Sequence, residues 1–154
     1  MENKWTDIAD EAIGISEFNT DYGWIQENTQ EWQYPLINNG GATVRSIKCP
    51  VTMKLLPKNI KNAGFSLLDY GHIVRPRPTQ GKRFHLCLSG CDYVYNNTTQ
   101  THDEIDGVYF IQGTRVINHK DGVSYTFTGE EPWGLVNMTN GSIIYFWCKY
   151  FHDM

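Results

Sequence analysis

Residues 43–56, TVRSIKCPVTMKLL, separate into two faces when every second residue is read. One face carries Ile47, Cys49, Val51, Met53 and Leu55, and the other is mostly polar. Because successive side chains of a strand point to opposite faces, this alternation predicts a half-buried β-strand. Pro50 lacks a backbone donor, so we expect the strand to lie at a sheet edge or to break there. A long one-sided strand needs a second layer, which predicts a β-sandwich or barrel.

The run 142–151, SIIYFWCKYF, is apolar or aromatic on both faces. A strand with one face in water would alternate with polar residues, so we expect this strand to be covered on both sides. It is either central in the sandwich or part of a subunit interface. Tyr145, Trp147 and Tyr150 are the candidate interface residues.

Turn residues divide the rest of the chain into short strands. Asp121-Gly122 separates the runs 114–119 and 123–127, and Asn140-Gly141 precedes 142–151, so both turns predict hairpins. The pattern indicates an all-β chain, an antiparallel β-sandwich or jelly-roll-like barrel of about eight strands.

Residues 1–42 show no sustained period. Residues 6–12 predict a single helical turn, and the remainder predicts an extended arm with one or two short strands that ends at the Asn-Asn-Gly-Gly turn of residues 38–41. We therefore divide the chain into an N-terminal arm, residues 1–42, and a β-sandwich domain, residues 43–154.

Composition excludes several classes of protein. The chain has 154 residues, which suits one domain, and its net charge of −4 disfavours a general nucleic-acid binder. It has no apolar run long enough to cross a membrane, and the first residues have no signal-peptide core. We expect synthesis in the cytoplasm, with the virion as one destination. Aromatic residues make up 14%, which favours strands and leaves rings for a core, an interface or a ligand platform.

The four cysteines are Cys49, Cys87, Cys91 and Cys148, and the sequence leaves open whether they are thiols, disulfides or metal ligands. A cytosolic product would keep them as thiols, although two disulfides are possible by number. Cys49 and Cys148 lie in strand-like runs and are interpreted as small buried hydrophobes. A zinc site that combines Cys87 and Cys91 with His85 is geometrically possible on a strand, but the spacing does not favour it. Neither metal nor cofactor is predicted.

Two groups of residues are candidate ligand contacts. Four cations between residues 75 and 83 form an Arg-Pro loop that can bind an anionic metabolite or seat an acidic partner. They are Arg75, Arg77, Lys82 and Arg83. Flat aromatic side chains in or near loops can form a platform for a carbohydrate or a protein. They are Trp32, Tyr34, Tyr93, Tyr95 and Trp133.

No phosphate-binding loop, nucleophile elbow, zinc-protease or dinucleotide motif is present, which favours a non-enzymatic protein without excluding an enzyme. The preferred hypothesis is an oligomeric module, a homotrimer by preference, for assembly or receptor attachment in virus or phage particles. The first alternative is a small-ligand binder, either a carbohydrate-binding module or an anion binder that uses the Arg-Pro loop. The second is a β-barrel enzyme whose candidate residues are His85, His102, Asp103 and Glu104.

Overall fold

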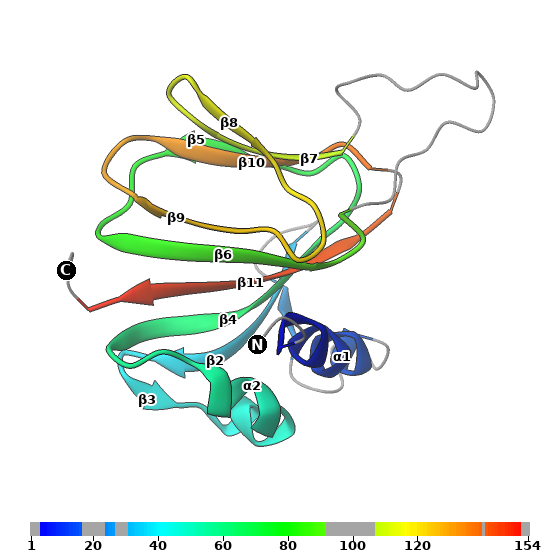
Figure 1. The fold of residues 1–154 in the computed structure, drawn as a ribbon, viewed down its shortest axis with the longest axis vertical. Helices are drawn as coiled ribbons and strands as arrows, with labels where there is room; N and C mark the ends of the chain where they lie inside the picture. The colour runs from blue at the N-terminus through cyan, green and yellow to red at the C-terminus, as the bar shows by residue number, and fades with distance from the viewer. Residues whose placement is uncertain (1–3, 17–23, 27–30, 92–106, 140, 152–154) are drawn as a thin grey trace.

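The computed structural model describes residues 4–16, 24–26, 31–91, 107–139 and 141–151. Over these residues eleven strands form two antiparallel sheets, and two α-helices and one 3-10 helix accompany them. The sheets face each other with a core between them (Figure 1). The predicted class, an antiparallel β-sandwich or barrel, is confirmed.

The larger sheet has seven strands. Its order is β1 (Ile25–Gln26), β2 (Glu31–Asn38), β4 (Ile60–Leu68), β11 (Ile143–Tyr150), β6 (Lys82–Ser89) and β9 (Ser124–Thr128), and β3 (Gly41–Ala42) also pairs with β2. The smaller sheet has the order β5 (Ile73–Arg77), β10 (Trp133–Asn137), β7 (Val108–Gln112) and β8 (Arg115–Asn118).

Strand β11 lies in the middle of the larger sheet, paired with β4 and β6. Its alternate residues enter two different cores. Ile144, Phe146 and Cys148 belong to the core on the outer face of the sheet. Ile143 and Tyr145 belong to the core between the sheets. The prediction that this run is covered on both sides is therefore confirmed.

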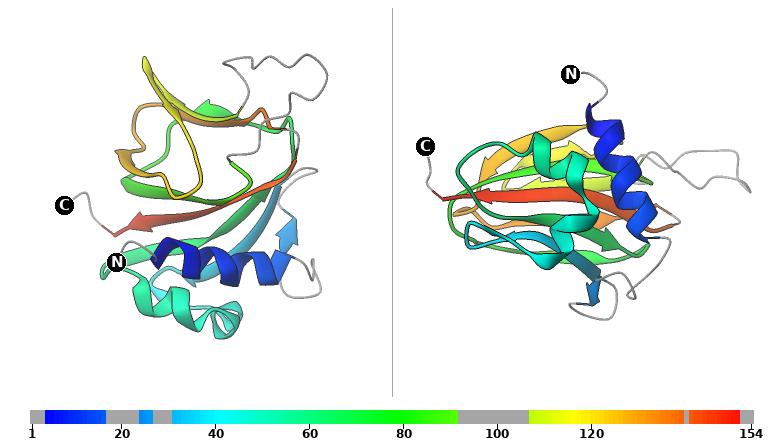
Figure 2. Two further views of the ribbon diagram at one scale, coloured as in Figure 1. Left: turned by 45° about the vertical axis from the view of Figure 1, so that its right-hand side comes forward. Right: turned by 90° about the horizontal axis from the view of Figure 1, so that it is seen from below.

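Helices α1 (Lys4–Ser16) and α2 (Pro50–Leu55) cover the outer face of the larger sheet (Figures 1 and 2). Ile8, Ala12 and Ile15 of α1 enter the outer core, because they recur at helical spacing. The helix predicted over residues 6–12 is present and extends further in both directions. No helix among the described residues is long and apolar enough to cross a membrane.

The described part of residues 1–42 contributes to the sheet as well as to the helical layer, since β2 pairs with β4 along most of its length. Tyr34 and Leu36 of β2 are fully buried. The boundary after residue 42 stays a prediction.

The strand predicted over residues 43–56 is wrong. Residues Val44–Lys48 form the 3-10 helix η2 and Pro50–Leu55 form α2. Pro50 sits at the start of α2, where its missing N–H costs nothing and its fixed φ suits a helix. The Glu11 carboxylate of α1 accepts hydrogen bonds from the backbone N–H groups of Val51 and Thr52 at 2.7 and 2.8 Å. These donors have no partner inside a helix, so Glu11 caps α2 from a distant part of the sequence.

Both predicted hairpins are also wrong. Strand β8 pairs with β7 in the smaller sheet, whereas β9 pairs with β6 in the larger one. The Asp121-Gly122 turn therefore carries the chain from one sheet to the other, with Gly122 at φ +85°. The segment between β10 and β11 makes the same kind of passage. A turn-forming dipeptide fixes the local change of direction, but it does not fix which strand becomes the neighbour.

Candidate functional site: a cavity between the sheets

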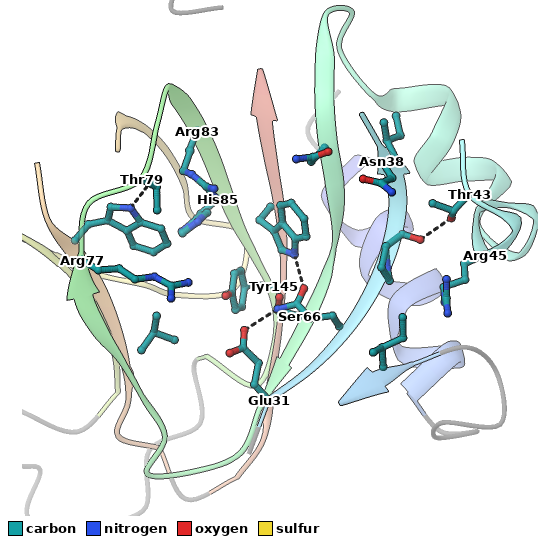
Figure 3. Close-up of a pocket in the computed structure, with 18 residues that line it drawn as sticks. Glu31, Asn38, Thr43, Arg45, Ser66, Arg77, Thr79, Arg83, His85 and Tyr145 are labelled. Atoms are coloured by element: carbon teal, nitrogen blue, oxygen red, sulfur yellow. Dashed lines mark hydrogen bonds between the residues drawn. The ribbon is translucent and has the colours of Figure 1, made fainter. Parts of the chain in front are cut away.

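A cavity of about 540 Å³ opens between the two sheets and continues across β4 and β2 (Figure 3). Small-molecule sites commonly have volumes of about 300–1,000 Å³, so a metabolite fits. The lining combines charged, aromatic and hydroxyl groups from both sheets. The residues that matter most below are Glu31, Arg77, Arg83, Trp133, Tyr145 and Trp147.

Two guanidinium groups lie on the side of the cavity formed by β5 and β6. Figure 3 shows Arg77 extending from β5 toward Tyr145, with Arg83 on β6 of the opposite sheet. The Arg83 guanidinium lies 5.6 Å from the centre of the Trp133 ring. Its Nε is buried and has no hydrogen-bond partner among the described residues. Burial, and secondarily the charge of Arg77, lower the pKa of Arg83. This cation is therefore poorly solvated and lacks a full set of acceptors.

A carboxylate stands at another part of the same cavity. Glu31 Oε2 accepts a hydrogen bond from Gln33 Nε2 at 2.7 Å, and Gln33 Oε1 accepts one from Trp147 Nε1 at 3.2 Å (Figure 3). Glu31 Oε1 lies 3.9 Å from His72 Nε2. The cavity lining thus contains one carboxylate, from Glu31, and three guanidinium groups, from Arg45, Arg77 and Arg83, and this excess of positive charge favours an anionic ligand.

The middle of the cavity is polar but uncharged at neutral pH. Burial raises the pKa of Tyr145, and the nearby Glu31 adds to the effect, so the phenol stays protonated. Burial lowers the pKa of His85 well below its usual range, helped by His119 and Arg83. The imidazole is therefore neutral, and its Nδ1 lies 3.1 Å from the Tyr125 hydroxyl.

The donor groups of this cavity do not fit a metal ion. Its lining contains one imidazole, from His85, and one carboxylate, from Glu31. Among the described residues, the three side chains that come together as possible metal ligands lie elsewhere, at Cys87, Cys91 and His119. The cavity offers guanidinium, indole and hydroxyl groups, which bind anions and organic ligands by hydrogen bonds and ring contacts.

Only two of the four cationic residues predicted as ligand contacts line the cavity. Arg77 and Arg83 line the cavity, whereas Arg75 and Lys82 do not. The stretch predicted as a loop includes strand β5, where Pro76 is tolerated because β5 is an edge strand. Lys82 points to the opposite side of β6 from Arg83, and its Nζ lies 5.2 Å from the centre of the Tyr150 ring.

Of the predicted aromatic contacts, only Trp133 lines the cavity among the described residues. Tyr34 is fully buried in the outer core, and Trp32 packs against that core. Tyr93, Tyr95, His102, Asp103 and Glu104 lie outside the described residues.

The candidate interface residues lie on different sides of β11. Tyr145 is 5% exposed and Trp147 is half-buried, and both line the cavity. Tyr150 is half-buried at the end of the strand. Their role in an interface stays a prediction.

The cysteines also separate into two kinds. Cys49 and Cys148 are buried and unpaired, as predicted for small hydrophobes. Cys87 and Cys91 are joined in a disulfide, one of the states that the sequence left open.

Sequence reasoning missed Glu31, Gln33, Thr79 and Trp147 as site residues. Glu31 and Gln33 belong to the segment interpreted as an arm, so nothing in their neighbourhood connected them to the loop of cations. The sequence did indicate which residues of β6 share a face. By alternation, Arg83, His85 and Cys87 all point to the same side of that strand.

The sequence matches no protein-family model and no curated protein. Its fold, however, is similar to that of solved structures. One is KdgF from Halomonas sp., with a TM-score of 0.54 and 9% identity over 88% of this chain and 94% of that one. Another is the Cupin_2 domain of an XRE family transcriptional regulator from Enterobacter cloacae, with a TM-score of 0.51 and 10% identity over 80% and 98%. The fold is a cupin barrel.

A structure of DMSP lyases also has this fold in common with the chain, with a TM-score of 0.54 and 8% identity over 85% of this chain and 57% of that one. The main hypothesis from the sequence, a viral or phage module for assembly or receptor attachment, is therefore wrong. A place in the virion likewise has no support.

Proposed function

We propose that the chain binds a small organic anion, bearing a carboxylate or phosphate group, in the cavity between the two sheets. Arg77 and Arg83 hold the anionic group, and the Trp133 and Trp147 rings pack on the remainder of the ligand. The observation that carries the proposal is the buried Arg83 Nε, which has no acceptor among the described residues.

The charge arrangement supports an anion. Neither Arg77 nor Arg83 forms an ion pair with another described residue. A guanidinium with spare donors in a partly dry site binds carboxylate or phosphate oxygens strongly, because its fork matches their geometry. Trp133 is held in place by the hydrogen bond that its Nε1 donates to Thr79 Oγ1 at 3.0 Å. The ring beside Arg83 is therefore pre-positioned.

Isothermal titration calorimetry with glucuronate, inorganic phosphate and glucose tests the proposal. We expect glucuronate to bind and glucose, its neutral counterpart, to bind much more weakly. Arg83→Met should weaken glucuronate binding about 10–100-fold, the value of a lost charged hydrogen bond. Lys82→Met is the matched control, because this adjacent cation points away from the cavity, and it should leave the affinity unchanged.

Two results would contradict the proposal. Equal binding of glucose and glucuronate would favour a carbohydrate-binding module that uses the indole rings. Equal losses in Arg83→Met and Lys82→Met would show that only the overall charge matters. Recording proton NMR spectra of the same mixtures over time distinguishes a binder from an enzyme, since an enzyme converts the ligand.

A homo-oligomer, with the trimer preferred from the sequence, is proposed alongside. Light scattering after size exclusion measures the mass directly, and a monomer at all protein concentrations would reject it.

A further inference from the structure

A second cluster of reactive groups lies further along β6. Cys87 is near the end of β6, Cys91 follows the turn at Gly90, and His119 follows β8. The two Sγ atoms and an imidazole nitrogen all lie within 4.8 Å of one another. All three residues are completely buried. Four residues of strand separate Arg83 from Cys87, or about 13 Å at the usual rise, so the cluster is distinct from the anion-binding groups.

The backbone around the cluster is closely fixed. Gly90 has φ +89°, and a Cβ there would approach the Ser142 carbonyl oxygen to 2.6 Å, so only glycine permits this turn. The backbone N–H of His119 donates to the Val108 carbonyl at 2.6 Å. The tight turn at Gly90 thus fixes the backbone next to Cys91, and the hydrogen bond to Val108 of β7 fixes the backbone of His119.

His119 is the feature that points to a ligand. Both of its ring nitrogens are buried, and neither forms a hydrogen bond of standard geometry with a described residue; the Val123 backbone interacts only weakly with the ring. Buried polar atoms almost always have partners, so an imidazole with two unmatched nitrogens needs an explanation. Its place beside two sulfur atoms supplies one, because imidazole and thiolate together are the preferred ligands of zinc.

A carboxylate borders the same group. Asp121 Oδ1 accepts a hydrogen bond from the Cys91 backbone N–H at 2.9 Å and lies 3.5 Å from Cys87 Sγ. The Gly122 backbone N–H donates to the Cys87 carbonyl at 2.8 Å. These hydrogen bonds hold the turn between β8 and β9 against the end of β6. They also place the Asp121 carboxylate next to the sulfur atoms.

We propose that the reduced form of this cluster binds one Zn²⁺ through Cys87, Cys91 and His119, with Asp121 or water as the fourth ligand. The spacing of Cys87 and Cys91, with three residues between them, is wider than the C-x2-C spacing that the sequence analysis took as typical, but it lies within the C-x2–4-C range of zinc sites. The disulfide and the metal site are alternative states of the same two sulfur atoms, since sulfur atoms bonded to each other cannot act as thiolate ligands.

The chemistry of the exchange is as follows. A phosphine reductant adds two electrons to the S–S bond, two protons give the two thiols, and the phosphine takes oxygen from water to become the phosphine oxide. Zn²⁺ then replaces both thiol protons, which pass to the buffer, and His119 supplies a nitrogen lone pair.

The two states differ in what they connect. The disulfide closes a short loop within one segment, between residues four apart. A metal ion held also by His119 joins β6 of the larger sheet to the chain after β8 of the smaller sheet. Metal binding should therefore stabilise the packing of the two sheets against each other more than the disulfide does.

Cobalt spectroscopy on the full chain tests the proposal. Co²⁺ titrated into protein reduced with tris(carboxyethyl)phosphine should give thiolate charge-transfer absorption and strong tetrahedral d–d bands that saturate at one ion per chain. Zn²⁺ should then remove these bands by displacement. The unreduced protein should give neither, a comparison that needs no substitution. Zn²⁺ should also raise the unfolding temperature of the reduced chain only.

Variants assign the ligands. His119→Gln should abolish the cobalt bands, while the double variant Cys49→Ser, Cys148→Ser should keep them, because those thiols lie in the outer core. Circular dichroism verifies that each variant is folded. Absence of the bands in reduced wild-type protein would overturn the proposal, and so would their persistence in folded His119→Gln.

Discussion

The two faces of the seven-stranded sheet use the same strands for different purposes. On the outer face, Leu86 and Phe146 pack beneath the helices in a core of aliphatic and aromatic side chains. On the inner face, the adjacent residues His85 and Tyr145 belong to a layer that also holds guanidinium, carboxylate and hydroxyl groups. Alternation along a strand separates these roles, so a single step in sequence moves from the stabilising layer to the ligand-binding layer.

The largest expected effect comes from Phe146→Ala on the outer face. Phe146 is 3% exposed and meets the rings of Phe65 and Phe84 at 6.1 and 6.3 Å between centroids. Its removal leaves a cavity and should lower the free energy of unfolding by about 3–5 kcal/mol, measured by urea denaturation. Ligand affinity of the folded variant should not change.

Tyr145→Phe is the matched variant for the inner face, one residue away. It removes only a hydroxyl, so its cost in unfolding free energy should be about 0.5–1.5 kcal/mol. The comparison between faces breaks down if the two variants lose equal stability, or if Phe146→Ala weakens ligand binding.

An intermediate effect is expected for Glu11→Ala, which removes the cap of α2. Glu11 also accepts a hydrogen bond from Thr52 Oγ1 at 2.6 Å, so Thr52, which is fully buried, loses its partner. We expect a loss of about 1–2 kcal/mol in unfolding free energy, measured by urea denaturation. Asp10→Ala changes an exposed neighbouring acid and should have little effect. Equal losses in both variants would reject the capping role.

The smallest effect is expected from alkylation of Cys49 and Cys148. Burial raises the pKa of each thiol from its ordinary value of 9.0 to about 12. The thiolate fraction at neutral pH falls by about 1,000-fold, and thiolate is the form that reacts. Iodoacetamide should leave both residues unmodified in the folded protein by mass spectrometry and modify both after unfolding. Rapid modification of the folded chain would mean that the helical layer opens.

The sequence predicted those parts of the fold whose causes are local. The double-sided apolar pattern of residues 142–151 is a direct consequence of covering both faces of β11. The strand predicted over residues 43–56 was wrong because their alternation is compatible with a strand. The contact that selects a helix there comes from Glu11, about 40 residues away. The two hairpins predicted from Gly-containing turns were wrong because the residues of a turn do not specify which sheet the next strand joins.

The same distinction applies to the candidate site. Arg77 and Arg83 were predicted because cations cluster in their stretch of sequence. Glu31 was missed, since it reaches the cavity only through the pairing of β2 with β4. For the second cluster, the sequence combined the two cysteines with His85, the nearest histidine along the chain. The fold instead brings His119 to them from the other sheet.

The central position of β11 has a consequence for how the chain reaches this fold. Strands β4 and β6 pair with β11 on either side, and β11 follows both by many residues. Until residues 143–150 have been synthesised, β4 and β6 each present an unpaired edge, and the barrel cannot close. Pairings between distant segments form slowly, so we expect the nascent chain to depend on protection of these edges until β11 is inserted.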